Sequence, residues 1–533
     1  MKMALHGQDK VPTGPLGPRR SGWLLAAISV AGVAAWGQGA SAQAACTVDL
    51  PVLPDVTISQ VSAETAPVPH CKVDGVIGGK IHFELLLPDD WNGKFVMGGG
   101  GGFVGSVLNS ALLFGALQSG YASVGTDTGH QGHPLDASWA LDDLEALVNF
   151  GHLAVHRTAV TAKALINAYY QRQISRSYFT GCSRGGGQAI MSASRYPEDF
   201  DSIVAGAPAI DWTGMGALAT QVNRAMYPDP DNLSRAVVGP EAEALLERSY
   251  MAACDGLDGL EDGILSDPRQ CHFDVASLQC DAGATNECLS PEEVAAIRAV
   301  YDAPRDSAGI QLNYGYSFGG ETSPRGSSRW LTGGLDDFTE EFQEGIGSGG
   351  FKPPISPSAM FSFGNGIMRD FVYHDEDWSY LDYDPDSYAK DSKVAAATLN
   401  AKTPDLSAFR ARGGKLLIYS GWSDSAIPPL GTIGYYEDVL AHDPSAAADV
   451  RLFMLPGVEH CSGGPGPSYV NFLTEIDTWT ETGQAPDAVI ALWLDAQHQP
   501  DGGRPVCAYP QVVRYDGSGD PRDPASFSCG SAN

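Results

Sequence analysis

Short apolar runs separated by turn residues recur along the first third of the chain and predict β-strands. The predicted strands are residues 81–87, 95–97, 121–125 and 177–180. Apolar residues at spacings of three and four predict a helix from about residue 147 to residue 170, and a second helix opens at about residue 188. Because strands and helices alternate, the sequence predicts an α/β fold with a mostly parallel sheet.

The periodic pattern weakens after about residue 212. Residues 212–395 are rich in Asp, Gly, Ser and aromatic side chains, and buried strands are predicted again only at 414–420 and 450–455. We therefore expect a catalytic α/β domain formed by residues 43–211 and 396–533, with residues 212–395 inserted between its halves as a lid domain.

The first 42 residues combine a basic head, a short apolar run and a stretch of small residues. This order predicts a cleaved signal peptide, residues 1–42, with cleavage after Ala42 or, as the alternative, after Ala44. A lipoprotein would use Cys46 as the acylated residue, but the Leu usual before such a cysteine is missing. We therefore expect an exported protein, either periplasmic or secreted.

Composition narrows the class of protein. Apolar residues make up 43% of the 533 positions, which excludes a largely disordered chain. The 64 acidic and 33 basic residues give a formal net charge of −31, which disfavours a generic binder of nucleic acid or anionic membrane. Apolar runs all stay below the roughly 18 residues of a spanning helix, so we expect no membrane span.

All ten cysteines follow the predicted signal peptide, and an even number in an exported protein predicts five disulfides. The sequence alone does not fix their connectivity, but neighbours in sequence give four economical pairs: Cys46–Cys71, Cys254–Cys271, Cys280–Cys288 and Cys507–Cys529. Cys182 and Cys461 then remain as a long-range pair. A zinc site is disfavoured because the chain has no Cys-x-x-Cys spacing.

The pentapeptide 181–185 carries the strongest chemical signal. It matches Gly-x-Ser-x-Gly around Ser183, and it stands between a predicted strand and a predicted helix, as the nucleophile elbow of a hydrolase requires. An ordinary glycine-rich turn is the alternative. In strand–turn–helix context the motif predicts that Ser183 is a nucleophile.

A serine nucleophile needs a base, and the base needs a carboxylate to orient it. His460 lies in the loop after the predicted strand 450–455, and Asp424 follows the strand 414–420, in the order Ser, acid, His. Cys182 precedes the serine and Cys461 follows the histidine. A bridge between them would hold both loops together, whereas two independent buried thiols are the alternative.

The oxyanion of the reaction needs two backbone N–H groups. One is expected from Arg184, directly after the nucleophile. The other is expected from the glycine string 98–102, where Gly102 is the choice and Gly101 the close alternative. A phosphate-binding loop is excluded because no Gly-Lys-Ser/Thr follows the glycines.

Four acidic residues lie within eight positions between Asp255 and Asp262, separated by glycines. Carboxylates on a tightly turning chain suit calcium, although the spacing is not that of an EF-hand. A solvated acidic turn is the alternative reading of this segment.

Taken together, these motifs resemble the tannase and feruloyl esterase family, which includes the mono(2-hydroxyethyl) terephthalate hydrolases. The resemblance covers essentially the whole chain after the signal peptide. It rests on Gly-Cys-Ser-x-Gly-Gly at 181–186, His460-Cys461, Gly-Trp-Ser-Asp at 421–424 and the stretch 121–130.

The resemblance implies an α/β-hydrolase core with a large lid, a Ser183–His460–Asp424 triad and a Cys182–Cys461 bridge beside it. It also implies a structural calcium ion in the lid. Its ligands would be the side chains of Asp255, Asp258 and Asp262 and the carbonyls of Leu260 and Ile264.

The same resemblance implies a serine carboxylic ester hydrolase that cleaves small esters of aromatic acids through an acyl-enzyme. A feruloyl esterase is expected, and a tannase or a mono(2-hydroxyethyl) terephthalate hydrolase is the alternative. Candidate lid residues for the aromatic group and for a substrate carboxylate are Trp330, Phe361, Phe363, Phe371, Arg325, Arg329 and Arg369. Surface position is the alternative for each arginine.

Two other classes remain open at this stage. A calcium-dependent carbohydrate-binding protein would account for the acidic loop, but not for the cysteines that adjoin Ser183 and His460. A peptidase or amidase would use the same three catalytic groups.

Overall fold

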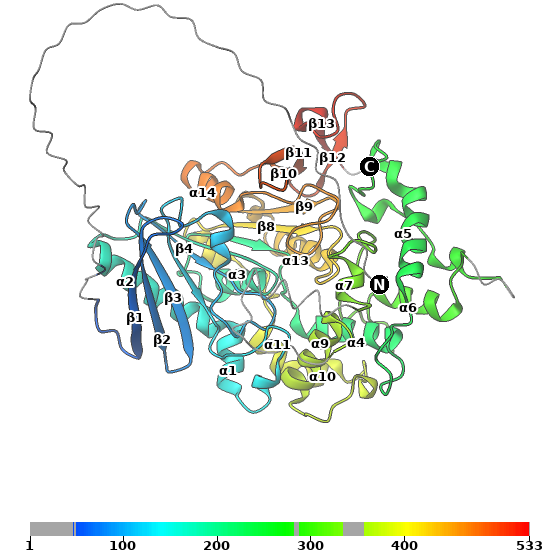
Figure 1. Cartoon of the computed structure of the whole chain (residues 1–533), viewed down its shortest axis with the longest axis horizontal. Helices are drawn as coiled ribbons and strands as arrows, with labels where there is room; N and C mark the ends of the chain where they lie inside the picture. The colour runs from blue at the N-terminus through cyan, green and yellow to red at the C-terminus, as the bar shows by residue number, and fades with distance from the viewer. Residues whose placement is uncertain (1–45, 47–49, 282–286, 334–355, 532–533) are drawn as a thin grey trace, which may run out of the picture. The chain divides into compact units, whose positions relative to one another are not determined.

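The computed structural model describes Cys46 and residues 50–281, 287–333 and 356–531 (Figure 1). The predicted signal peptide, residues 1–42, lies outside the described residues. The described residues from Cys46 onward belong to one compact unit, and the boundaries expected for a lid domain stay a prediction. Among the helices of the described ranges, none combines the length and the apolar character that crossing a membrane requires.

A nine-stranded mixed sheet forms the centre of the fold, in the order β1-β2-β3-β5-β4-β6-β7-β8-β9. The strands are β1 (Val56–Glu64), β2 (His70–Ile77), β3 (Ile81–Pro88), β4 (Lys94–Gly98), β5 (Ala122–Thr126), β6 (Arg176–Cys182), β7 (Ser202–Gly206), β8 (Lys415–Gly421) and β9 (Val450–Leu455). The pairs β1–β2, β2–β3 and β3–β5 are antiparallel. The strands β5, β4, β6, β7, β8 and β9 run parallel to one another. The predicted α/β fold with a mostly parallel sheet is confirmed.

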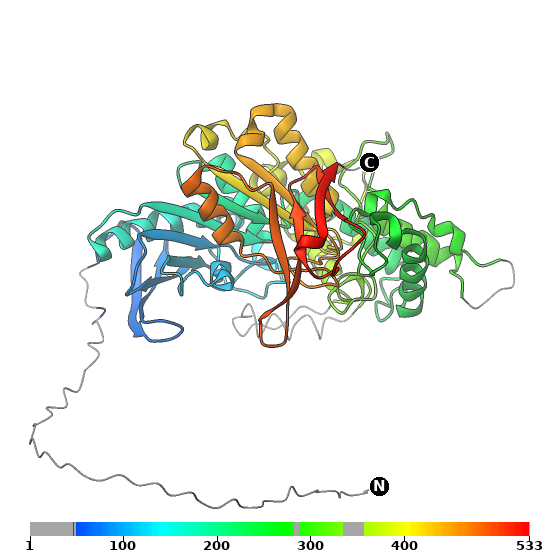
Figure 2. The same cartoon turned by 90° about the horizontal axis from the view of Figure 1, so that it is seen from above.

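Helices cover both faces of the parallel strands because alternate side chains of each strand point to opposite faces. In β4, Phe95 and Met97 enter the core that α2, α3 and α13 cover, and Val96 enters the opposite core with α14. Figure 2 gives a second view of this arrangement. The bounds of these helices are α2 (Ala154–Tyr170), α3 (Arg184–Arg195), α13 (Pro429–His442) and α14 (Phe472–Thr482).

The helix predicted over 147–170 is interrupted. It consists of α1 (Leu144–Val148), a π-helix η3 (Asn149–Leu153) and α2, while α3 begins four positions before the predicted residue 188. The π-turn is wider than the α-helical period, so the apolar spacing alone does not reveal it.

The named elements described between β7 and β8 are helices, and this excursion shares a third hydrophobic core with the loop after β4, through Phe103 and Val104. Within the described ranges its α- and π-helices are α4 (Trp212–Met226), α5 (Pro240–Cys254), α6 (Pro291–Tyr301), α7 (Ser327–Trp330), α9 (Ala359–Asn365), the π-helix η8 (Gly366–Tyr373), α10 (Tyr388–Asp391), α11 (Lys393–Leu399) and α12 (Ser407–Ala411). This shared core joins the excursion to the edge of the sheet where the parallel strands end.

Two small antiparallel sheets follow α14. They are formed by β10 (Ala488–Leu494) with β11 (Pro500–Cys507), and by β12 (Gln511–Tyr515) with β13 (Phe527–Ser531). All ten cysteines are paired in the predicted combinations: Cys46–Cys71, Cys182–Cys461, Cys254–Cys271, Cys280–Cys288 and Cys507–Cys529.

Buried acids in the excursion predict a pH-dependent stability. Glu243 on α5 is 4% exposed and accepts a hydrogen bond from Thr332 Oγ1 at 3.0 Å. Burial raises the pKa of Glu243 to about 7, with Glu321 and Glu247 adding repulsion. The folded state therefore keeps a proton that the unfolded chain loses, so this contribution to stability is present below pH 4.5 and is lost as pH rises through about 7.

We expect Glu243→Gln to raise the free energy of unfolding at pH 8 by about 1–2 kcal/mol, with little effect at pH 5. Urea denaturation of wild type and variant at both pH values measures this change in the free energy of unfolding. The matched control is Glu241→Gln, on the exposed side of the same helix. A Glu243→Gln variant that loses stability equally at both pH values would contradict the prediction.

Candidate active site

Ser183 occupies a strained turn between β6 and α3. Its backbone has φ +62° and ψ −123°, a conformation that costs energy for any residue with a side chain and persists only when its surroundings impose it. The Ser183 N–H donates to the carbonyl of Gly206 at 3.0 Å, and the Ala209 N–H donates to the Ser183 carbonyl at 3.0 Å. The turn therefore has the strand–turn–helix context expected for a nucleophile elbow.

The glycines of the motif are required by close backbone approach. A Cβ on Gly181 would lie 2.6 Å from the carbonyl carbon of Gly185, and a Cβ on Gly186 would lie 2.2 Å from the carbonyl oxygen of Gly206. Neither contact is sterically possible for a larger residue, so α3 can begin immediately after the serine only because these positions lack side chains.

His460 and Asp424 form a hydrogen-bonded pair. His460 Nδ1 lies 2.8 Å from Asp424 Oδ2, and the Asp424 side chain is fully buried. Asp424 Oδ1 accepts backbone N–H groups from Ala426 and Ile427, each at 2.8 Å. Asp424 thus orients the imidazole with Nδ1 toward the carboxylate and Nε2 away from it, which is the orientation that a base acting through Nε2 requires.

The Cys182–Cys461 disulfide brings the serine turn and the histidine loop together. Its two Cα atoms are 5.9 Å apart, although 279 residues separate them in the sequence. Because each cysteine is the direct neighbour of Ser183 or His460, the bridge holds both residues at the same edge of the sheet. Asp424 reaches this edge from the loop after β8.

The glycine string after β4 lies against the serine turn. A Cβ on Gly99 would approach Gly185 Cα to 2.6 Å. Within the described ranges, the backbone N–H groups of Arg184, Gly102 and Gly101 donate to no protein acceptor. These N–H groups could thus bind an oxyanion, and the choice between Gly102 and Gly101 stays open.

Two polar side chains hold the glycine string, and sequence reasoning did not identify them. Gln188 Oε1 accepts the Gly100 N–H at 3.1 Å, and His130 Nε2 hydrogen-bonds the Phe103 carbonyl at 2.9 Å. A glutamine in the second turn of a buried helix was the available signal for the first of these contacts.

Trp330 and Phe363, both predicted to contact substrate, lie beside the candidate catalytic groups. The Trp330 ring meets the His460 imidazole edge-to-face with centroids 5.1 Å apart, and it stacks with Phe363 at 6.2 Å. A ring atom of Phe363 lies 3.4 Å from the position of a Cβ on Gly102. These two rings therefore border the space between the histidine and the glycine string.

Two further predicted substrate residues, Phe361 and Arg369, have partners elsewhere. Phe361 packs against the rings of Tyr227 and Tyr380. Arg369 forms a two-bond fork with the buried carboxylate of Asp370, at 2.7 Å and 2.9 Å. A substrate carboxylate would have to compete with Asp370, so the binding roles of Phe361 and Arg369 remain predictions.

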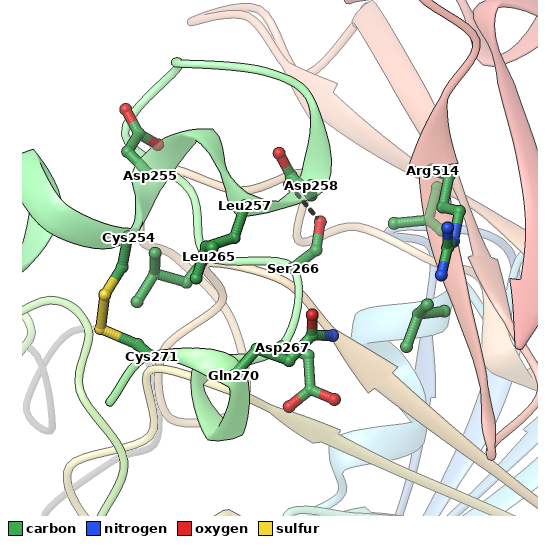
Figure 3. A pocket seen from close by; sticks show the side chains of 12 residues that line it. Cys254, Asp255, Leu257, Asp258, Leu265, Ser266, Asp267, Gln270, Cys271 and Arg514 are labelled. Carbon is green, nitrogen blue, oxygen red and sulfur yellow. Dashed lines mark hydrogen bonds between the residues drawn. A yellow bond between two sulfur atoms is a disulfide. The ribbon is translucent and has the colours of Figure 1, made fainter. Parts of the chain in front are cut away.

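The acidic loop lines a cavity of about 70 Å³ (Figure 3). Asp255 accepts the Gly263 N–H, and Asp258 accepts the hydroxyl of Ser266 at 2.5 Å. Asp262 forms an ion pair with Arg504 of β11. Burial raises the pKa of Asp258.

The donor chemistry of this loop, carboxylates with backbone carbonyls on a glycine turn, suits calcium. However, the described residues contain no group of three acidic, histidine or cysteine side chains close enough to hold a metal ion. The calcium ligands Asp255, Asp258, Leu260, Asp262 and Ile264 therefore stay a prediction.

Comparison with known proteins places the chain in a family. The family model described as tannase and feruloyl esterase matches residues 66–530. The chain is 32% identical to a mono(2-hydroxyethyl) terephthalate hydrolase of Piscinibacter sakaiensis, over 91% of this chain and 89% of the relative. It is 34% identical to a probable feruloyl esterase of Arthroderma benhamiae, over 84% and 81%.

The fold is shared with a solved relative. The crystal structure of feruloyl esterase B from Aspergillus oryzae matches with a TM-score of 0.77 at 24% identity, covering 90% of this chain and 97% of that one. The resemblance inferred from the motifs is confirmed: the chain belongs to the tannase and feruloyl esterase family and is a carboxylic ester hydrolase.

Proposed function

We propose that the protein is a serine esterase that hydrolyses small esters of aromatic acids through an acyl-enzyme. One observation carries the proposal. The Cys182–Cys461 bridge joins the strained Ser183 turn to the loop of His460, whose Nδ1 bonds to the buried Asp424. This arrangement supplies a nucleophile, a base and an orienting carboxylate at one edge of the sheet.

In the first half-reaction, Ser183 Oγ attacks the ester carbonyl carbon as its proton moves to His460 Nε2. The carbonyl electron pair moves to oxygen, and this oxyanion accepts hydrogen bonds from the N–H of Arg184 and from an N–H of the glycine string, that of Gly102 or Gly101. When the tetrahedral intermediate collapses, the carbon–oxygen bond to the alcohol breaks and His460 returns the proton to that alcohol. The acyl group is left on Ser183.

In the second half-reaction, His460 removes a proton from water, and the resulting hydroxide adds to the acyl carbon. Collapse of this intermediate releases the acid and returns the proton to Ser183. Asp424 keeps its negative charge and stabilises the imidazolium formed in each half. The same catalytic groups would also cleave an amide, so an esterase and an amidase are distinguished here by the substrate that is cleaved.

The rings of Trp330 and Phe363 support an aromatic acyl group, because flat apolar rings favour stacked or edge-to-face contacts. The names of the relatives support the same class, with ferulate esters first and gallate or terephthalate half-esters as alternatives. Export is supported by the five disulfides, which persist in oxidising compartments.

The nucleophile prediction concerns Ser183→Ala. The wild type is expected to cleave at least one of methyl ferulate, methyl gallate, mono(2-hydroxyethyl) terephthalate and p-nitrophenyl butyrate. The variant should lose about 10³-fold or more in kcat because the acyl-enzyme cannot form. Initial rates of wild type and variant across the panel measure the ester cleavage and its loss. A ferulic anilide is added to the panel to test amide cleavage.

Ser194→Ala is the matched control. Ser194 lies on the same helix as Arg184, and among the described residues its hydroxyl bonds only to carbonyls of that helix. Its substitution should leave kcat within about twofold of wild type, as expected for a residue outside the catalytic groups. If wild type cleaves no ester of the panel but binds a glycan, the carbohydrate-binding reading replaces the proposal.

We further propose that the acidic loop binds one structural calcium ion. Removal of the ion by a chelator should lower the melting temperature, and added calcium should restore it, because binding to the folded state alone stabilises that state. The rate constant kcat, measured below both melting temperatures, should change little. Metal analysis of the purified protein and calorimetry provide the two readouts.

Asp258→Asn should abolish the chelator-sensitive shift in melting temperature, whereas Asp281→Asn, an exposed acid of the same excursion, should preserve it. Purified protein that contains no calcium, and whose melting temperature is the same with calcium and with chelator, would overturn this proposal.

A further inference from the structure

The side chain of Arg184 is buried without a carboxylate partner. It follows Ser183 directly, is 1% exposed, and forms no ion pair within the described part of the chain. Burial lowers the pKa of its guanidinium. Charged side chains are seldom fully buried unless paired, because the loss of hydration is costly.

The guanidinium instead binds backbone and aromatic rings. Its Nη2 donates to the carbonyls of Phe150 and Gly151, the latter at 3.1 Å, and both carbonyls belong to the π-helix η3. Its central carbon lies 4.2 Å from the centroid of the Phe150 ring and 5.5 Å from that of Trp212. The cation is thus stabilised by carbonyl dipoles and ring faces.

The same two rings also hold the glycine string. Phe103, the residue after Gly102, packs against Phe150 with centroids 6.4 Å apart and against Trp212 at 5.8 Å. Both candidate oxyanion donors are therefore attached, each through one side chain, to a single layer formed by Phe150 and Trp212. A shift of either anchor would change the distance between the two N–H groups.

We infer that the Arg184 guanidinium is a positioning group. It holds the N–H of Arg184 and the N–H of the glycine string at the separation that lets both donate to the oxyanion. The inference rests on the proposed function and extends it to a side chain that touches no reacting atom. Its contribution appears only when charge develops on the carbonyl oxygen. It should therefore act on kcat and leave KM nearly unchanged.

The test uses Arg184→Met, which keeps the apolar stem and removes the donors, and Arg184→Lys, which keeps the charge without the planar fork. We expect kcat to fall about 10–10²-fold in the methionine variant and by less in the lysine variant, with KM changed by less than about threefold. Inhibition by phenylboronic acid, whose adduct on Ser183 is tetrahedral, should weaken in the same order. Affinity for the free product acid should be retained.

Arg410→Met is the control for a purely structural effect. Arg410 on α12 is largely buried but pairs with Asp443 and Asp449, away from the serine turn. This variant should lower the melting temperature and leave kcat of the folded protein unchanged. If Arg184→Met does not fold, Arg184→Lys carries the test through its kcat and its boronic acid inhibition.

Wild-type kcat in the folded Arg184 variants, or equal weakening of boronic acid and product acid, would overturn the inference. These outcomes are distinct from failure of the proposed function. That failure is read from wild type and Ser183→Ala alone, before any Arg184 variant is compared.

Discussion

The covalent bond between Cys182 and Cys461 is the constraint on which the site depends. The sheet places the ends of β6 and β9 on the same edge, but β7 and β8 lie between them. The serine and histidine loops must therefore bend toward each other across two strands. The bridge holds the Cα atoms of the two cysteines 5.9 Å apart across a sequence separation of 279, and the loop that it closes contains the whole excursion. Closing so long a loop restricts the unfolded chain strongly in the chain-entropy view of disulfide stabilisation.

The site also combines an unfavourable backbone conformation with an unfavourable buried charge. Ser183 has a positive φ, and Arg184 is a buried cation without a carboxylate partner in the described ranges. Such features persist only when the surroundings impose them. Here the surroundings are the sheet edge on one side and, on the other, a core of Phe103, Phe150 and Trp212 that the excursion completes. Strain at Ser183 is thus offset by packing in an aromatic layer next to it.

Most parallel strands could be predicted because they are short continuous apolar runs bounded by turn residues. β7 was missed, since Ser202 to Gly206 is brief and contains small residues whose burial comes entirely from neighbouring strands. β1 and β2 were also missed, because their partly exposed polar positions weaken the apolar signal. The π-helix η3 escaped notice because it inserts a wider turn into an otherwise regular helical spacing.

By itself, the sequence determined the features that are local or countable: the Gly-x-Ser-x-Gly turn, the chain order of Ser183, Asp424 and His460, and an even set of cysteines, whose pairing it predicted but did not fix. Only the tertiary structure decided which distant groups the long side chains contact. The Arg184 guanidinium lies over the Phe150 ring, and the Trp330 ring contacts the His460 imidazole edge-to-face. Asp262 pairs with Arg504, which lies 242 positions further along the chain. The physical reason is that a turn or a strand is specified by a few adjacent residues. The partner of a buried charge or ring depends on which distant segment the fold packs against it.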